Sequence, residues 1–117
     1  MDARSESDVK KGCLEYLKIL ENLREIVWVD RLNSGEIYVR RKKGKRQKIA
    51  LCRKGTPDIY VRFKTGKTVW IETKSNDKKK LSPEQILFRL KHEAIGDKYL
   101  IITTVHDLKK RLFKDEE

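Results

Sequence analysis

Several residue types that often shape a small fold are scarce in this chain of 117 residues. There are two prolines, one methionine and two cysteines. The cysteines, Cys13 and Cys52, lie far apart and lack the CxxC spacing of a zinc site, which also argues against a disulfide framework. One falls in a helical pattern and the other in a strand pattern, so we expect both to be core residues in a reducing, cytoplasmic setting.

Long hydrophobic runs are also missing from the sequence. No stretch approaches the roughly 18 apolar residues that a membrane span requires, and the opening residues MDARSESD are too polar and acidic for a signal peptide. We therefore expect no membrane partner. The length suits one compact domain over residues 1–117, and the sequence has neither internal repeats nor an interdomain linker.

Acidic residues are few beside basic ones. Asp and Glu number 18 against 29 Lys and Arg, which gives a formal net charge of +11. A small domain this basic is expected to bind a polyanion, and nucleic acid is the first candidate. The alternative is that the charge only keeps the surface soluble. Two basic clusters are the predicted phosphate contacts: Arg40, Arg41, Lys42, Lys43, Lys45 and Arg46, and then Lys78, Lys79 and Lys80.

Hydrophobic periodicity predicts an α/β fold with a central mixed sheet flanked by helices. Strand 98–104 should lie parallel to the strand that ends at Lys74, because a helix of suitable length connects them. A solvated basic loop is expected at 41–48. The predicted elements are a helix at 5–23, strands at 26–31, 36–41 and 48–53, a hairpin at 58–74, a helix at 81–96, a strand at 98–104 and a helix at 105–113.

The two longer helices carry clear start signals. Ser5 caps the first helix, whose Gly12 indicates a close contact, and whose buried face is Val9, Cys13, Tyr16, Leu17 and Leu20. Ser82 caps the second helix and Gln85 completes a capping box, while Gly96 marks its end. The expected inner stripe of the second helix is Ile86, Leu90, Glu93 and Ala94.

The hairpin prediction has a definite register. A three-residue loop, Lys64-Thr65-Gly66, places glycine where a left-handed conformation is needed. Phe63 then pairs with Lys67, and the same register places Asp58 opposite Glu72. Alternation makes one face apolar, with Ile59, Val61, Phe63, Val69 and Ile71. The other face carries Asp58, Tyr60, Arg62, Trp70, Glu72 and Lys74. We expect Tyr60 and Trp70 to pack under the first helix rather than stack on DNA.

Two carboxylates at this distance repel each other unless a cation lies between them. Mg²⁺ favours oxygen ligands and keeps several waters, so Asp58, Glu72 and the Thr73 backbone carbonyl form a plausible ligand set. Such an ion supports phosphodiester hydrolysis, and Lys74 can orient the attacking water or stabilise the developing charge. The alternative is an ordinary surface ion pair. His92 and His106 show no catalytic pattern.

At these residues the chain resembles the PD-(D/E)xK nucleases. Pro57-Asp58, a short hairpin and Glu72-Thr73-Lys74 match that signature. Gly55-Thr56-Pro57-Asp58 and Leu81-Ser82-Pro83-Glu84-Gln85 resemble more narrowly the VRR-NUC branch, with its GxPD, ExK and LSxxQ motifs. The opening helix and the turn at 33–35 resemble small stand-alone members found in phages.

The resemblance implies an α-β-β-β-α-β core and a dependence on Mg²⁺ or Mn²⁺. It implies that Asp58 and Glu72 are metal ligands, that Thr73 offers its carbonyl, and that Lys74 is catalytic. Gln85 matches the glutamine beside the site, although the capping box alone explains its position. The family also places an acid on the first helix. Glu6 and Glu15 compete for this role; the helical wheel favours Glu6, with capping as its alternative role.

The resulting expectation is a metal-dependent DNA endonuclease of phage type, in the host cytoplasm if phage-encoded. The resemblance to Holliday-junction resolvases implies branched DNA as substrate and a homodimer, since symmetric cleavage needs two sites. The alternatives are a basic nucleic-acid-binding module that keeps the fold without catalysis, and a subunit that cuts only within a larger repair or replication assembly. No counterpart in the family accounts for the basic segment at 41–48.

Overall fold

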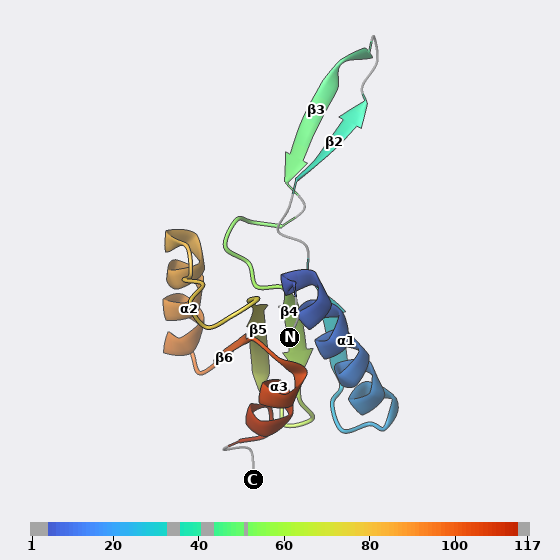
Figure 1. Ribbon diagram of the computed structural model, residues 1–117, viewed down its shortest axis with the longest axis vertical. Helices are drawn as coiled ribbons and strands as arrows, with labels where there is room; N and C mark the ends of the chain where they lie inside the picture. Colours follow the sequence, from blue (N-terminus) through green and yellow to red (C-terminus); the bar gives the residue numbers. More distant parts are fainter. Residues whose placement is uncertain (1–4, 33–35, 41–43, 51, 115–117) are drawn as a thin grey trace.

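The fold is a four-stranded mixed sheet with helices on both faces (Figure 1). A computed structural model describes residues 5–32, 36–40, 44–50 and 52–114. The sheet has the order β1-β4-β5-β6, and the α/β architecture agrees with the predicted class. Its strands are β1 (Trp28–Arg31), β4 (Ile59–Arg62), β5 (Thr68–Thr73) and β6 (Lys98–Ile102), and its helices are α1 (Glu6–Asn22), α2 (Pro83–Ala94) and α3 (Val105–Arg111).

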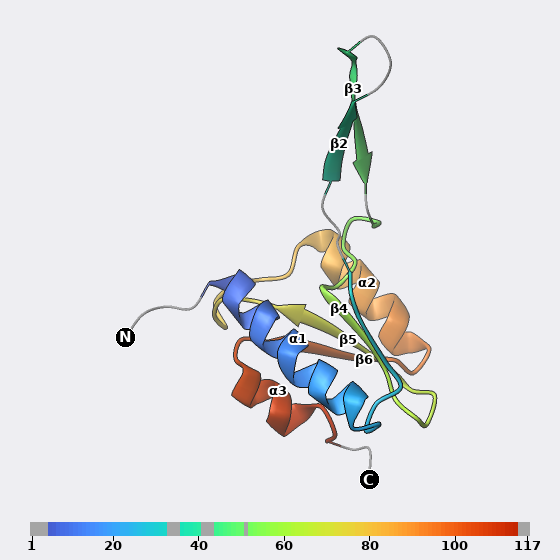
Figure 2. The same cartoon turned by 90° about the vertical axis from the view of Figure 1, so that its right-hand side faces the viewer.

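Helices α1 and α3 cover one face of the sheet, and α2 covers the other (Figure 2). The core lies under α1 and α3. There Val9, Cys13 and Leu17 of α1 meet the apolar side of β4 and β5, together with Leu108 of α3. Gly12 permits this packing, because a Cβ atom at that position would lie 2.7 Å from Val105 Cγ2. The close contact predicted at Gly12 is confirmed.

The predicted hairpin register is confirmed. Ile59 pairs with Ile71, Tyr60 with Trp70, and Val61 with Val69 in an antiparallel ladder. At the turn, the Phe63 amide donates to the Lys67 carbonyl at 2.9 Å, and Gly66 adopts a φ of 91°. All five residues of the predicted apolar face are buried. Strand β6 runs parallel to β5, also as predicted, and α2 makes the crossover between them.

The second and third predicted strands do not join the central sheet. Strands β2 (Glu36–Arg40) and β3 (Arg46–Ala50) form a separate antiparallel hairpin that projects from the domain in Figures 1 and 2. The sheet instead pairs β1 with β4. Part of the expected basic loop is therefore strand, because Arg46–Lys48 pair with Tyr38–Arg40. Residues 41–43 lie outside the described part of the chain.

The predicted inner stripe of α2 is wrong. Ile86 and Leu90 are exposed by 46% and 62%, and Glu93 and Ala94 are exposed as well. The helix instead packs through Phe88 and His92, which contact the Trp70 ring at centroid distances of 4.9 and 5.1 Å. Trp70 therefore packs under α2, and the expectation that it would lie under the first helix is also wrong.

The two cysteines have different environments. Cys13 is fully buried, as predicted, and burial raises the pKa of its thiol to about 11. Cys52 was expected to be a core residue on a strand, but it is half-buried in a bend after β3. Within the described residues, no helix is both long and apolar enough to cross a membrane.

Candidate metal centre

Asp58 and Glu72 meet where the central hairpin opens. The β4–β5 ladder ends at the Ile59–Ile71 pair, so the two acids lie one step beyond it. Asp58 Oδ2 accepts hydrogen bonds from the Thr73 amide at 2.8 Å and from the Thr73 hydroxyl at 2.7 Å. These two bonds fix the Asp58 carboxylate against the end of β5. The expected proximity of the two acids is confirmed by the structure.

Glu6 joins these acids from the first turn of α1. Ligand oxygens of Glu6, Asp58 and Glu72 lie within 4.8 Å of one another. Ser5 positions Glu6 because it caps α1 through a capping box with Asp8. Glu15 lies farther along α1, where it lines a groove with Lys18 and Arg31, and its carboxylate is not among the clustered oxygens. Of the two candidate acids on this helix, Glu6 is therefore the one that lies beside Asp58 and Glu72. We call Glu6, Asp58 and Glu72 the acid cluster.

Glu72 is the most buried member of the acid cluster. Its side chain is 5% exposed, and its Oε2 atom is buried without a hydrogen-bond partner among the described residues. Burial first, and then the charge of Asp58, raise the pKa of its carboxyl to about 8. An unpartnered buried oxygen beside two further carboxylates matches the oxygen ligands that Mg²⁺ and Mn²⁺ prefer. The residues present thus fit a divalent cation.

Gln85 links the acid cluster to the start of α2. Its Nε2 donates to Glu72 Oε1 at 3.0 Å, while its Oε1 accepts from the Ser82 amide at 2.8 Å. The same Oε1 accepts from Lys74 Nζ at 3.4 Å. Gln85 therefore takes part in the capping box and also contacts Glu72, so the two explanations of its position hold together.

Lys74 lies beside the acid cluster with only 12% of its side chain exposed. Its Nζ atom is 3.9 Å from Glu72 Oε1, at the outer limit of an ion pair. It follows β5 directly, and its amide donates to the Ile102 carbonyl of β6 at 2.9 Å. Lys74 is thus held near the acids by the backbone of the sheet rather than by a tight ion pair.

Gly55 explains why the segment before Asp58 can approach α2. Its φ is 96°, and a Cβ atom there would lie 2.6 Å from the Glu84 carbonyl oxygen. Both the left-handed backbone and the close approach to Glu84 require glycine. Because Glu84 precedes Gln85, this contact sets the spacing between the Asp58 segment and the helix that carries Gln85.

Sequence reasoning missed Lys10, which contacts the acid cluster directly. Its Nζ atom lies 3.2 Å from Asp58 Oδ1, and its side chain is 24% exposed. Lys10 follows Glu6 by one helical turn, so the two share a side of α1. This spacing was the available signal, although it becomes informative only once Glu6 is known to point at the sheet.

The predicted phosphate-contacting residues fall in two places. Arg40, Lys45 and Arg46 are exposed on the β2–β3 hairpin, and Lys78, Lys79 and Lys80 are exposed in the turn before α2. Arg41, Lys42 and Lys43 lie outside the described residues. His92, which was given no catalytic role, stacks on Phe88 and lies 3.2 Å from Asp97 through its Nδ1 atom.

The chain was compared with known proteins and structures. No protein-family model matches the sequence, and no curated protein matches it either. Among solved structures, a VRR_NUC domain is similar to this chain, with a TM-score of 0.58 and 16% sequence identity. The match covers 97% of this chain and 100% of the other. The protein therefore has the fold of a VRR_NUC domain, which supports the resemblance seen at the GxPD, ExK and LSxxQ motifs.

Proposed function

We propose that this protein is a metal-dependent DNA endonuclease of the VRR-NUC type. The observation that carries the proposal is the acid cluster itself, in which the buried Glu72 Oε2 has no hydrogen-bond partner among the described residues. A nuclease-like fold and a net charge of +11 support a nucleic-acid substrate. Both cysteines are free, which suits a reducing compartment such as the cytoplasm.

Glu6, Asp58, Glu72 and the Thr73 carbonyl are the residues that would hold Mg²⁺ or Mn²⁺. Bound there, the cation would supply Lewis-acid stabilisation of the phosphate and a water of lowered pKa. Gln85 holds Glu72 by one oxygen and leaves the other free for a ligand. Thr73 holds Asp58 through Oδ2 alone. The other oxygen, Oδ1, lies 3.2 Å from Lys10 Nζ, so a cation at Asp58 would compete with this lysine.

Lys74 is the proposed catalytic lysine, and it acts through its positive charge. Its ammonium group lies within reach of Glu72 and Gln85, and little of it is exposed to solvent. There it can orient the attacking water or stabilise the charge that develops on the phosphate oxygens. Hydrolysis adds the water to phosphorus and breaks one phosphorus–oxygen ester bond of the DNA strand.

Branched DNA is the proposed substrate, and a second copy of the chain is the proposed partner. The described residues hold one acid cluster, whereas symmetric cleavage of a four-way junction needs two. Three apolar side chains of α2 are exposed in the single chain, which supports a surface that a second copy would cover. They are Ile86, Leu87 and Leu90. Light scattering coupled to size-exclusion chromatography tests the dimer independently of cleavage.

The central experiment incubates the protein with linear duplex, flap, splayed-arm and four-way-junction DNA. Each is tested with Mg²⁺, Mn²⁺ or EDTA, and cleavage is expected with either metal and absent with EDTA. Asp58→Asn and Lys74→Met should each lower the cleavage rate by about a hundredfold or more. Lys64→Met serves as the control, because Lys64 is exposed in the hairpin turn, away from the acid cluster.

Three results would argue against this function as proposed. Cleavage by Asp58→Asn at the wild-type rate would show that the acid cluster is not required for the reaction. Salt-dependent DNA binding by the wild type, without cleavage of any substrate, would favour the non-catalytic binding module. Cleavage only after a cell extract is added would favour a subunit of a larger assembly.

A further inference from the structure

A basic groove runs along the outer side of α1, next to the acid cluster. Its volume is about 310 Å³. Four of its lining residues are cations and one is an anion, so the groove is strongly positive. The residues that line it are Ser7, Lys10, Lys11, Leu14, Glu15, Lys18 and Arg31. Of the four cations, none belongs to the two basic clusters that the sequence singled out.

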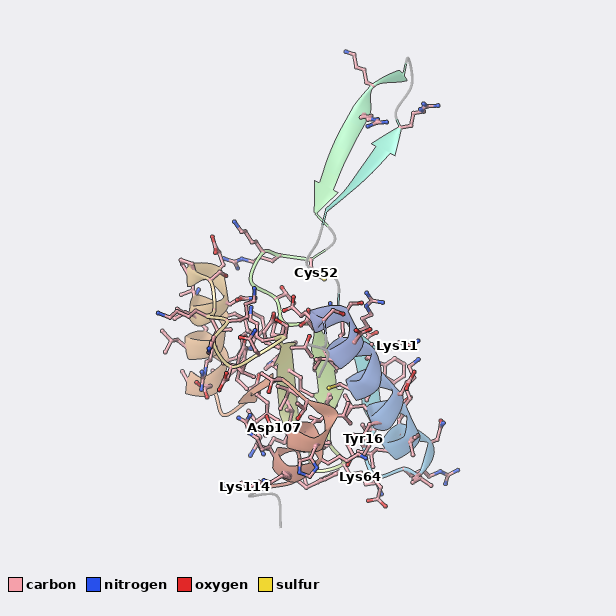
Figure 3. The ribbon with its side chains drawn as sticks, viewed as in Figure 1. Lys11, Tyr16, Cys52, Lys64, Asp107 and Lys114 are labelled. Atoms are coloured by element: carbon pink, nitrogen blue, oxygen red, sulfur yellow. The ribbon has the colours of Figure 1, made fainter. Side chains whose placement is uncertain are left out.

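Lys11 and Lys18 form the outer row of the groove. They are seven residues apart and therefore share one side of α1. Both are exposed, and neither forms an ion pair with another described residue. Figure 3 shows Lys11 on the side of α1 that points away from α2. Seven residues of helix span about 10.5 Å, which is close to the rise of about three nucleotides at 3.4 Å each.

Lys10 connects the groove to the acid cluster. It lines the groove and also lies 3.2 Å from Asp58 Oδ1. A phosphate chain that follows Lys18 and Lys11 along the helix therefore arrives at the oxygen ligands of the proposed metal. Arg31, at the end of β1, adds a guanidinium group, which suits phosphate because it can donate two parallel hydrogen bonds.

We propose that this groove holds the phosphate backbone of the DNA strand that leads into the acid cluster, with Lys10 as its innermost contact. The inference rests on the proposed nuclease function and adds the path of the substrate. It also separates the roles of the cations: the lysines of α1 position the strand at the site of cleavage, whereas the β2–β3 hairpin contacts DNA at a distance from it.

The test measures DNA binding in EDTA, so that no cleavage occurs. A fluorescein-labelled four-way junction and a labelled single strand are titrated by fluorescence anisotropy at several salt concentrations. The groove variant is Lys11→Gln/Lys18→Gln, and the matched control is Lys64→Gln/Lys114→Gln. Both variants lose two positive charges, but Lys64 and Lys114 lie at the end of the molecule opposite the β2–β3 hairpin (Figure 3).

The groove variant should bind more weakly and with a smaller salt dependence. Losing two phosphate contacts lowers the slope of log K against log salt by about 1.4 to 1.8. The control should keep the wild-type slope. Equal loss in both variants would show a general effect of net charge and overturn the proposal, as would wild-type binding by the groove variant. Circular dichroism checks that α1 stays folded, which is expected because glutamine is a good helix former.

The binding test and the cleavage test can fail separately. If the wild type binds DNA but never cleaves it, the proposed catalysis is wrong. The salt dependence of binding by the two variants still tests whether the groove holds DNA. If the wild type cleaves DNA and the groove variant binds as tightly as the control, the proposed role of the groove is wrong, while the nuclease function is retained. A further prediction concerns the cleavage positions on a junction, which should become less uniform in the groove variant because the strand is positioned less firmly.

Discussion

Lys10 Nζ lies 3.2 Å from Asp58 Oδ1, so a cation of the protein already contacts the proposed metal ligands. The contact offsets repulsion within the acid cluster and lowers the pKa of Glu72, against the larger opposite effects of burial and Asp58. A divalent cation at Asp58 must therefore compete with this lysine.

The first prediction is that Lys10→Met tightens metal binding. Removing the competing ammonium group leaves three carboxylates with less compensation, so Mn²⁺ should bind about threefold to tenfold more tightly. Calorimetric titration with Mn²⁺ measures the change. Lys11→Met is the control, because Lys11 is the next residue and contacts no member of the acid cluster in the described structure. Weaker binding in Lys10→Met than in Lys11→Met would contradict the prediction.

The second prediction separates the two roles of Gln85. Gln85→Glu keeps an acceptor for the Ser82 amide but places a carboxylate against Glu72 in place of the amide donor. Helix α2 should remain capped, while cleavage should fall about tenfold or more. Ser82→Ala should do the reverse: it removes the cap at a cost of about 1 kcal/mol in the free energy of unfolding and leaves the acids in place. Urea unfolding and cleavage assays, run together on both variants, give the comparison.

The third prediction concerns pH. Because the pKa of Glu72 is raised from 4.5 to about 8, its carboxyl is mostly protonated at pH 6 and must release a proton to bind a cation. The affinity for Mn²⁺ should therefore rise with pH up to about 8, by at most about tenfold per pH unit, and then level off. An affinity that is constant from pH 6 to 8 would show that Glu72 is not a ligand.

The raised pKa of Glu72 also predicts how the stability of the metal-free protein depends on pH. A raised pKa means that folding favours the protonated carboxyl, so this stabilisation is complete below about pH 4.5 and is lost as pH rises towards 8. The free energy of unfolding in EDTA should decline over that range. Glu72→Gln should lack this part of the decline, because an amide does not titrate.

The fourth prediction compares two glycines with nearly the same backbone. Gly55 has a φ of 96° and Gly66 has a φ of 91°, so alanine is strained at both positions. At Gly66 a Cβ atom meets open space, and Gly66→Ala should cost about 1 to 2 kcal/mol in the free energy of unfolding. At Gly55 it meets the Glu84 carbonyl at 2.6 Å, so Gly55→Ala should cost clearly more and also impair cleavage. Equal costs in urea unfolding would contradict the importance of the Gly55–Glu84 contact.

Local rules were enough to predict the central hairpin. A three-residue turn with glycine last and strict alternation along β4 and β5 specify its register, because both depend on neighbouring residues only. That register brings Asp58 and Glu72 together, and the caps at Ser5 and Ser82 were readable for the same reason. Helical periodicity also selected Glu6 over Glu15 as the acid near the sheet.

Long-range packing decided the features that the pattern predicted wrongly. Strands β2 and β3 have strand character, but nothing local tells whether they pair with the sheet or only with each other. The choice of inward face on α2 is a clearer case. Its apolar stripe at Ile86 and Leu90 points outward, because the sheet face it covers carries Trp70 and Glu72 rather than aliphatic residues.

A helix packs by complementarity with the surface opposite it, and that surface is built by strands distant in sequence. Phe88 meets the Trp70 ring and Gln85 meets the Glu72 carboxylate, so α2 buries its aromatic and amide residues at the expense of its aliphatic ones. Local patterns in the sequence thus identified the three acids: hairpin pairing brings Asp58 opposite Glu72, and the helical periodicity of α1 selects Glu6. The contacts that hold and compensate those acids, from Lys10 on α1 and Gln85 on α2, came from the way separate elements pack around the sheet.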